Sequence, residues 1–183
     1  MSQIEKRSAG SGLDAIALLT EDHNRVKKLF GEFEMLKTGE DTEDEKLDIV
    51  QEICMELTIH AKIEEEIFYP AVIEEIGQLD IMDEAAVEHA AAKEQIEELV
   101  LMAPEEENYD AKVTVLKEMV EHHIKEEEGK MFPRLKKTTI DLVGLGQSLS
   151  QRKQELQMEV GMAGASMGKG QAGGEQIQRG PMP

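Results

Sequence analysis

Two short stretches of the sequence combine residue types that bind metal ions. The first, HAKIEEEIFYP, begins at His60, and the second, HIKEEEGKMFP, begins at His123. Each has a glutamate four residues after its histidine, Glu64 in the first and Glu127 in the second. Residues four apart lie on the same face of an α-helix. Each stretch is therefore predicted to present an imidazole and a carboxylate on one helical face.

Apolar residues before these pairs indicate that the shared face points into a protein core. They precede the histidines in steps of three or four residues: Val50, Ile53 and Leu57 before His60, and Val113, Leu116 and Val120 before His123. Such a stripe is typical of the buried seam of a bundled helix, where a carboxylate without a partner is energetically costly. Two His–Glu pairs that face each other across a bundle therefore suggest a metal site in the core, with the carboxylates as bridging ligands.

Two further histidines lie on predicted core faces. His23 falls in the middle of an apolar stripe that includes Leu19 and Val26, and His89 shares an inner face with Ile96. Four imidazoles from four predicted helices, together with two carboxylates, would then converge near the middle of the bundle. These donor types suit iron, manganese or zinc.

The order of the motifs along the chain favours two metal ions over one. A single core histidine followed by His-x3-Glu occurs twice in succession, so each half of the chain supplies two imidazoles and one carboxylate. The expected ligand set is His23 and His60 on one metal, His89 and His123 on the other, and Glu64 and Glu127 as bridges.

Side chains next to these six are interpreted as structural or solvent-facing. His122 lies about 100° around the helix from His123, so we expect it at the surface. The neighbouring acids are interpreted as solvated or as acceptors that orient the imidazoles: Glu65, Glu66, Glu126 and Glu128. Tyr69 and Phe132 are expected to be core contacts.

The elements that would position these residues are predicted to be helices. The good helix formers Ala, Leu, Glu, Lys and Met are abundant, only 3% of residues are aromatic, and the two-residue alternation of strands is missing. We therefore expect an all-α fold. Helices are predicted over residues 13–37, 42–76, 82–102 and 109–137, with bends at Pro70 and Pro133 and a stop at Gly77.

The ends of the chain differ in composition from the predicted bundle of residues 13–137. An additional short helix is predicted within residues 138–160, although Gly144 and Gly146 are poor helix formers. Residues 1–12 and 161–183 are small and polar without periodicity, so both segments are predicted to be disordered.

Charge, hydropathy and cysteine content disfavour several classes of protein. A net charge of −19 disfavours binding to nucleic acid or anionic membranes, which requires basic patches. No run of 18 apolar residues predicts a transmembrane helix, and no signal peptide is visible. The single cysteine, Cys54, excludes an intramolecular disulfide and suits a reducing compartment. A cytoplasmic location is therefore expected, and no protein partner is indicated.

The chain resembles the hemerythrin-like (HHE cation-binding) family in four segments: DAIALLTEDHNRVKKLFGEFE, HAKIEEEIFYP, VEHAAAKEQIEEL and HHIKEEEGKMFP. The resemblance covers residues 13–137, and LGQSLSQRKQEL is similar to the family's extra C-terminal helix. It implies an up-down four-helix bundle that holds two non-haem iron ions, bridged by carboxylates and an oxo or hydroxo group. The ligands implied are His23, His60, Glu64, His89, His123 and Glu127. The implied partner is a small ligand (oxygen, peroxide or nitric oxide), bound or processed in sensing or in protection against oxidative or nitrosative stress.

The sequence departs from the oxygen-carrying hemerythrins at two places. Those proteins have a second histidine four residues after the histidine of the third helix, where this chain has Lys93. They also use His-x4-Asp on the last helix, where this chain has His-x3-Glu. One iron would therefore lack an imidazole, and an open position favours chemistry with an exogenous ligand over oxygen carriage. Enzyme and sensor stay equal alternatives, because their ligand sets would be alike.

Two rival interpretations use the same predicted helices. A ferritin-like di-iron bundle carries Glu-x2-His, but no acidic residue stands three positions before any of the five histidines. A helical interaction module, metal-free or binding metal without redox chemistry, is the alternative from another class. In its metal-free form it would bury four imidazoles and two carboxylates without the ion that pairs them, which is costly.

Overall fold

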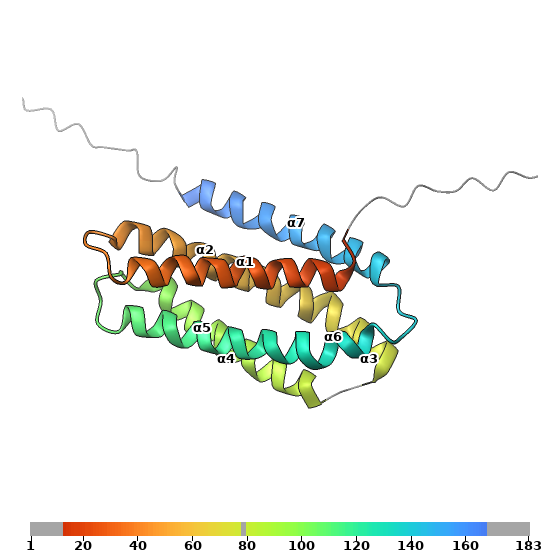
Figure 1. Ribbon diagram of the computed structural model, residues 1–183. Helices are drawn as coiled ribbons and strands as arrows, with labels where there is room; N and C mark the ends of the chain where they lie inside the picture. The colour runs from red at the N-terminus through yellow and green to blue at the C-terminus, as the bar shows by residue number, and fades with distance from the viewer. Residues whose placement is uncertain (1–12, 78–79, 168–183) are drawn as a thin grey trace, which may run out of the picture.

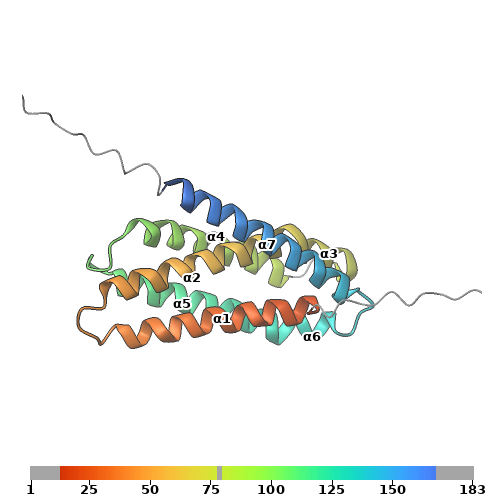
Figure 2. The same ribbon diagram turned by 90° about the horizontal axis from the view of Figure 1, so that it is seen from above.

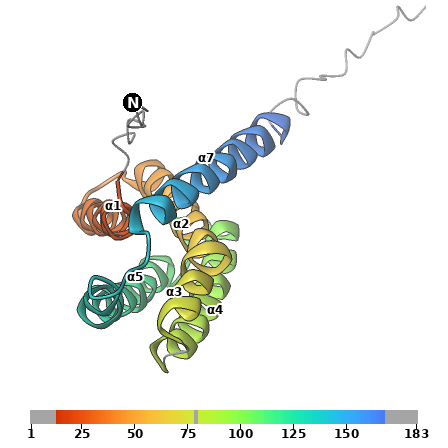
Figure 3. The same cartoon turned by 90° about the vertical axis from the view of Figure 1, so that its right-hand side faces the viewer.

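Four long helices form the body of the protein. The structure, a computed structural model, describes residues 13–77 and 80–167. The four helices are α1 (Ala15–Leu36), α2 (Glu43–Ile63), α4 (Asp80–Leu101) and α5 (Tyr109–Glu126). They run alternately up and down, as seen from the side in Figure 1 and along the bundle in Figure 3. Every regular element in the described ranges is helical, which confirms the predicted all-α bundle, and none of these helices is long and apolar enough to cross a membrane.

Two of the four helices continue through a π-helical turn into a further short helix. The added elements are η1 (Glu64–Phe68) and α3 (Tyr69–Ile76) after α2, and η2 (Glu127–Met131) and α6 (Phe132–Leu135) after α5. The predicted helices 42–76 and 109–137 are thus continuous helical stretches. Where the sequence predicted bends at Pro70 and Pro133, the structure shows a π-helical turn shortly before each proline.

Local signals in the sequence account for two of the helix ends. α1 begins after Asp14, whose Oδ1 accepts a hydrogen bond of 2.8 Å from the backbone N–H of Ala17, as expected for an N-cap. α3 ends at Gly77, whose φ of +80° lies in the region that glycine adopts without steric cost. The predicted stop at Gly77 is therefore confirmed.

A fifth helix, α7 (Leu142–Met167), crosses the outside of the bundle. It packs against α1, α2 and η1, and Figure 2 shows it lying over them. A Cβ atom on Gly146 would lie only 2.4 Å from the carbonyl oxygen of Leu13, so glycine permits the close approach of α7 to the start of α1. The helix continues past residue 160, where the sequence predicted a disordered tail. Residues 1–12 and 168–183 lie outside the described residues, as do the predictions of disorder made for them.

The core consists of two apolar clusters, one toward each end of the bundle. On α1, for example, Leu19 belongs to one cluster and Val26 to the other, with His23 between them. On α4, Ala85 and Ile96 flank His89 in the same way. The interior between the clusters is therefore the layer where polar side chains gather.

Candidate metal centre

Six polar side chains meet in this layer, and they are the six that the sequence predicted as ligands. Each bundle helix or its π-helical continuation contributes: His23 from α1, His60 from α2, Glu64 from η1, His89 from α4, His123 from α5 and Glu127 from η2. The four histidines are at most 7% exposed, and both glutamates are 0% exposed. Such burial of four imidazoles and two carboxylates requires partners that neutralise them.

The first group of donors contains His23, His60, Glu64 and Glu127, with one ligand atom from each lying within 4.8 Å of the others. The Nε2 atom of His60 is 3.1 Å from Oε1 of Glu64. The Nε2 atom of His23 is 3.3 Å from Oε2 of Glu127. All four donors therefore border one small space between α1, α2 and the two π-helical turns.

The second group contains Glu64, His89 and His123. The Nε2 atoms of the two imidazoles are 3.2 Å apart. Oε2 of Glu64 lies 3.4 Å from Nε2 of His89. Glu64 thus turns one oxygen to each group, which is the arrangement of a bridging carboxylate. Oε2 of Glu127 also lies 3.8 Å from Nε2 of His123, so the second glutamate borders both groups.

Unpaired buried atoms show that this donor set fits a cation. Nε2 of His23, Nε2 of His60, Oε1 of Glu64 and Oε2 of Glu127 are buried without a hydrogen-bond partner. Buried polar atoms are paired in the great majority of cases. These four ligand atoms, which form two imidazole–carboxylate contacts of 3.1 and 3.3 Å around one space, match what imidazole and carboxylate offer to zinc, manganese or iron.

The π-helical turns place the two glutamates. Glu64 and Glu127 are each the first residue of such a turn, and the backbone N–H of the residue after the turn donates five residues back to the glutamate carbonyl. Pro70 and Pro133 lack the N–H that an α-helix would use, which favours the wider turn. Turns of this type are frequent at functional sites, and here the sequence repeat has a matching backbone repeat.

Each imidazole also faces a carboxylate from a neighbouring helix. The contacts of the Nδ1 atoms are His23 with Glu128 at 2.8 Å, His89 with Glu65 at 2.9 Å, His123 with Glu88 at 2.9 Å, and His60 with Asp22 at 3.6 Å. The acid always comes from another helical stretch. α1 provides the acid for the histidine of α2, and η1 provides it for the histidine of α4. In the same way α4 provides the acid for the histidine of α5, and η2 provides it for the histidine of α1. Acceptors in this position fix the orientation of an imidazole and raise its basicity toward a metal.

Two of these four acids were missed in the sequence. Glu65 and Glu128 were predicted as solvated or orienting acids, and the structure shows that they orient imidazoles. Asp22 and Glu88 were not singled out, although each directly precedes a predicted core histidine. That adjacency was the available signal, but it does not reveal which helix the acid serves.

Tyr69 was also underestimated. Its ring is buried in an apolar cluster, as expected of a core contact. Its hydroxyl, however, lies among the six predicted ligands, which together we call the metal group. The hydroxyl donates to Oε1 of Glu127 at 3.0 Å and lies 3.4 Å from Oε2 of Glu64. Burial and the two carboxylates hold the pKa of Tyr69 well above its usual value. The phenol therefore keeps its proton and acts as a donor to the carboxylates.

Neighbouring carboxylates favour the protonated form of two of the four imidazoles, His60 and His123. Burial alone would lower the pKa of His60, but Glu64 and Asp22 outweigh it and raise that pKa to about 10. Burial likewise opposes charge on His123, but hydrogen bonding to Glu64 and Glu88 raises its pKa to about 11. Burial would raise the pKa of Glu64, but the histidines around it hold that pKa well below its usual value. A metal ion must therefore displace protons to bind.

A small cavity borders the metal group. Its volume is about 40 Å³. The polar lining includes His60, His89 and His123, and apolar side chains form most of the remaining wall, among them Val26, Leu57, Ala92, Ile96 and Val120. A water molecule needs about 10–15 Å³ measured in this way. The cavity therefore has room for very small molecules and none for an organic substrate of ordinary size.

Lys93 lies at the edge of this cavity and turns away from the metal group. Its Nζ contacts both carboxylate oxygens of Glu65 at 2.7 Å, and Glu65 in turn pairs with His89. The lysine therefore supports an orienting acid. The second group is left with two imidazoles and the shared Glu64, fewer side chains than the first group.

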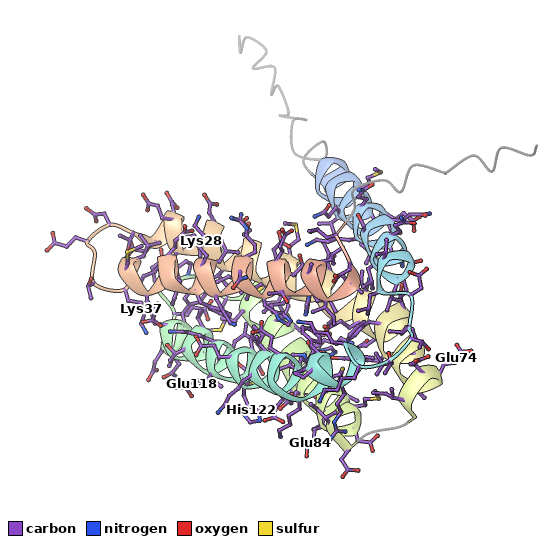
Figure 4. The ribbon with its side chains drawn as sticks, turned by 45° about the vertical axis from the view of Figure 1, so that its right-hand side comes forward. Lys28, Lys37, Glu74, Glu84, Glu118 and His122 are labelled. Carbon is purple, nitrogen blue, oxygen red and sulfur yellow. The ribbon has the colours of Figure 1, made fainter. Side chains whose placement is uncertain are left out.

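His122 lies outside the site, although it neighbours His123 in the chain. Its side chain is 62% exposed and contacts Glu88 at 3.4 Å. Figure 4 shows His122, together with Glu84 and Glu118, at the periphery of the molecule. The expected surface position of His122 is therefore confirmed.

Comparison with known proteins gives three matches. The family model described as the hemerythrin HHE cation-binding domain matches residues 14–135. The crystal structure of a hemerythrin HHE cation-binding domain-containing protein from Mycobacterium kansasii is similar with a TM-score of 0.66 and 25% identity, covering 89% of this chain and 95% of that one. A protein of Nostoc sp. (strain PCC 7120 / SAG 25.82 / UTEX 2576) named DNA nickase is 28% identical over 115 residues. That match covers 63% of this chain but only 31% of the relative, so the chain spans about a third of the relative's length.

Proposed function

Because the chain belongs to the hemerythrin HHE cation-binding family, we propose that it holds two iron ions and binds or reacts with a small diatomic or peroxide ligand. Oxygen, peroxide and nitric oxide are the candidate ligands, and sensing or protection against oxidative or nitrosative stress is the proposed role. Cation binding is the property that the family carries. The identity of the cation and its chemistry form the proposal.

The donor set supports an iron pair. His23, His60, Glu64 and Glu127 would hold one ion, and His89 and His123 would hold the other together with Glu64, as the two groups of donors lie. Imidazole with carboxylate suits iron, among other metals that change oxidation state. Once bound, the pair would supply electrons to, or accept them from, a small ligand.

The observation that carries the proposed ligand class is the cavity of about 40 Å³ beside His89 and His123. It is lined by imidazoles of both groups, including those of the group with fewer protein donors, where Lys93 contacts Glu65. A ligand could therefore reach that ion without displacing a protein side chain. The cavity volume restricts the ligand to a few heavy atoms, which fits a diatomic molecule or peroxide.

Other residues of the chain prepare the site for such a ligand. Tyr69 presents a hydroxyl proton between the two carboxylates, where it restrains Glu127 through a 3.0 Å hydrogen bond. The apolar cavity wall, which includes Val26 and Ile96, disfavours occupation by ordered water. A poorly hydrated site strengthens electrostatic interactions with a bound small molecule.

Three other hypotheses differ in their support. A helical interaction module without a metal leaves unexplained four donor atoms that are buried without a hydrogen bond. A module that binds metal without redox chemistry stays the alternative, and the experiment below separates it. DNA nicking is suggested only by the name of a relative that is about three times as long, and the net charge of −19 opposes binding to the phosphate backbone of DNA.

The proposed reducing, cytoplasmic setting agrees with the buried free thiol of Cys54.

Metal analysis combined with optical spectroscopy tests the proposal. The purified full-length protein should contain about two irons per chain and should absorb visible light as bridged ferric pairs do, since imidazole and carboxylate donors favour this metal. Oxygen, peroxide and nitric oxide are then added in turn. Rapid loss of peroxide would identify an enzyme, whereas a lasting spectral change without ligand consumption would identify a binder or sensor. A single zinc ion without visible absorption would refute the di-iron proposal.

A further inference from the structure

The fifth helix reaches the metal group through one charged side chain. Nζ of Lys153 lies 2.5 Å from Oδ1 of Asp22. The lysine side chain is 19% exposed and that of Asp22 only 10%, so the contact is largely shielded from water. α7 lies outside the four bundle helices, yet it supplies the cation for an acid that faces a metal-group imidazole.

The other carboxylate oxygen of Asp22 turns toward His60. Oδ2 lies 3.6 Å from Nδ1 of the imidazole, and both atoms are buried without a hydrogen-bond partner. The separation of 3.6 Å is longer than a hydrogen bond, and neither atom has a hydrogen-bond partner among the described residues. The orientation of the carboxylate therefore decides whether His60 has an acceptor behind it.

This arrangement differs from that of the other three imidazoles. Their acids are 24–37% exposed and face basic side chains of the bundle itself. The pairs are Glu128 with Lys27, Glu65 with Lys93, and Glu88 with His122. Water can help to solvate those acids if a cation is removed. Asp22 is the most buried of the four, and its closest cation comes from a separate element.

Packing fixes the position of Lys153 on α7. Leu149 and Leu156, four residues before and three residues after it, are 0% and 2% exposed, so the three residues lie on one inner face of the helix. The close approach at Gly146 anchors the same helix near its start. Lys153 is thus held where it meets Asp22.

We propose that Lys153 is a positioning residue of the metal centre, which acts through Asp22 on His60 and makes α7 a working part of the site. The proposal rests on the proposed metal-binding function and adds a residue from outside the four-helix bundle. Without the ammonium group, the carboxylate of Asp22 is free to turn away. The imidazole of His60 then loses the acceptor that holds Nε2 toward the first group of donors.

Competition for Fe(II) against a chelator, measured without oxygen on the full-length chain, tests this proposal. Loss of a partner that orients a metal-bound imidazole typically weakens affinity by about 10- to 100-fold, so Asp22→Asn should fall in this range. Lys153→Met should weaken one of the two metal equivalents by about tenfold, at the lower end of that range. The other equivalent, held by His89 and His123, should keep its affinity. The double variant should be no weaker than Asp22→Asn alone, because the lysine acts through the aspartate.

Two further variants separate positioning from general stabilisation of the fold. Arg152→Met removes the neighbouring ion pair of α7 and leaves Asp22 untouched, so it should not change metal affinity. Lys153→Arg keeps the cation and should restore most of the affinity. The thermal midpoint of each metal-free variant is recorded in parallel. If Lys153→Met does not fold, Lys153→Gln is measured against the same controls.

Equal weakening by Lys153→Met and Arg152→Met would overturn the proposal, as would full additivity with Asp22→Asn or unchanged affinity in Lys153→Met. These outcomes are distinct from failure of the proposed function. If the wild-type chain binds a metal other than iron, the comparison is repeated with that metal, and the ratio between variants still decides the role of Lys153. If the wild-type chain binds no metal at all, both proposals are refuted.

Discussion

Replacement of Glu64 by glutamine should weaken both metal positions at once. Glu64 belongs to both groups of donors. It lies 3.1 Å from His60 and 3.4 Å from His89 through different oxygens. Glutamine keeps the shape and removes the charge. His89→Ala, in contrast, leaves all four donors of the first group in place.

The effect on metal binding can be bounded from known cases. Losing a residue that merely orients a ligand costs about 10- to 100-fold in affinity. Losing a bridging carboxylate should cost at least as much at each position. Wild-type protein, His89→Ala and Glu64→Gln should therefore retain about two, about one and fewer than one metal per chain at a metal concentration that just saturates the wild-type protein, because each removed donor weakens only the positions that it serves.

The metal-free protein should also be destabilised. Breaking a buried ion pair from one side costs about 3–5 kcal/mol, and we expect the lower end because His60 and His123 can release their protons once the anion is gone. For a chain of this size, about 3 kcal/mol corresponds to a thermal midpoint lower by roughly 6–12 °C. Because the pKa of His60 is raised to about 10 and that of Glu64 is held well below its usual value, the stabilisation is complete between about pH 4.3 and pH 6.5. It is lost as the pH rises through the folded pKa of His60 and, in strong acid, as the pH falls through that of Glu64, so the two proteins should converge at alkaline pH.

Elemental analysis and thermal unfolding of the metal-free proteins would measure both effects. Glu74→Gln is the matched control, because Figure 4 places Glu74 at the surface near the end of α3, and exposed substitutions change stability by only about 0.5 kcal/mol. If Glu64→Gln retained as much metal as His89→Ala, the shared role of Glu64 would be refuted. An unchanged thermal midpoint would show that the buried charge pairs do not stabilise the metal-free fold.

Four further predictions follow from the geometry. His123→Ala should lower metal content sharply while His122→Ala should not, and equal losses on elemental analysis would mean that the helical register is wrong. Because the pKa values of His60 and His123 are about 10 and 11, metal loading at pH 7 should release at least one proton per chain, and metal affinity should fall as the pH falls. Calorimetry in buffers of different ionisation enthalpy measures this proton release, and a value of zero would contradict the prediction. Ala92→Leu should fill the cavity of about 40 Å³ and slow the reaction with peroxide or nitric oxide at unchanged iron content. An unchanged rate would mean that the ligand does not use this cavity. Tyr69→Phe should keep the metal but shift the optical spectrum, and an identical spectrum would mean that its hydroxyl does not influence the carboxylates.

The sequence predicted much of the fold because the relevant signals are local. The apolar stripe that contains Val50, Ile53 and Leu57 specifies both a helix and its inner face, and the four-residue spacing then places His60 and Glu64 together. His23 and His89 were found in the same way, from the apolar residues around them. The helix stop at Gly77 follows from backbone sterics that act within a few residues.

Other features depend on which helices are neighbours, and these could not be predicted. Asp22 and Glu88 are ordinary acids by their spacing, and they orient imidazoles only because α2 and α5 lie beside them. Gly146 lowers intrinsic helix propensity, yet it lies within α7 because the start of α1 comes too close for a side chain. In that case packing between distant segments outweighed a local preference.

Residue type and periodicity along single helices thus determined the all-α bundle and the six donors at its centre, because both are properties of one helix at a time. Only the tertiary structure decided the two donor groups that share Glu64, the π-helical turns, the hydroxyl of Tyr69 in the site and the contact of Lys153 with Asp22. The physical reason is that these features arise from contacts between segments far apart in the chain, or from a backbone register that the four-residue repeat does not encode.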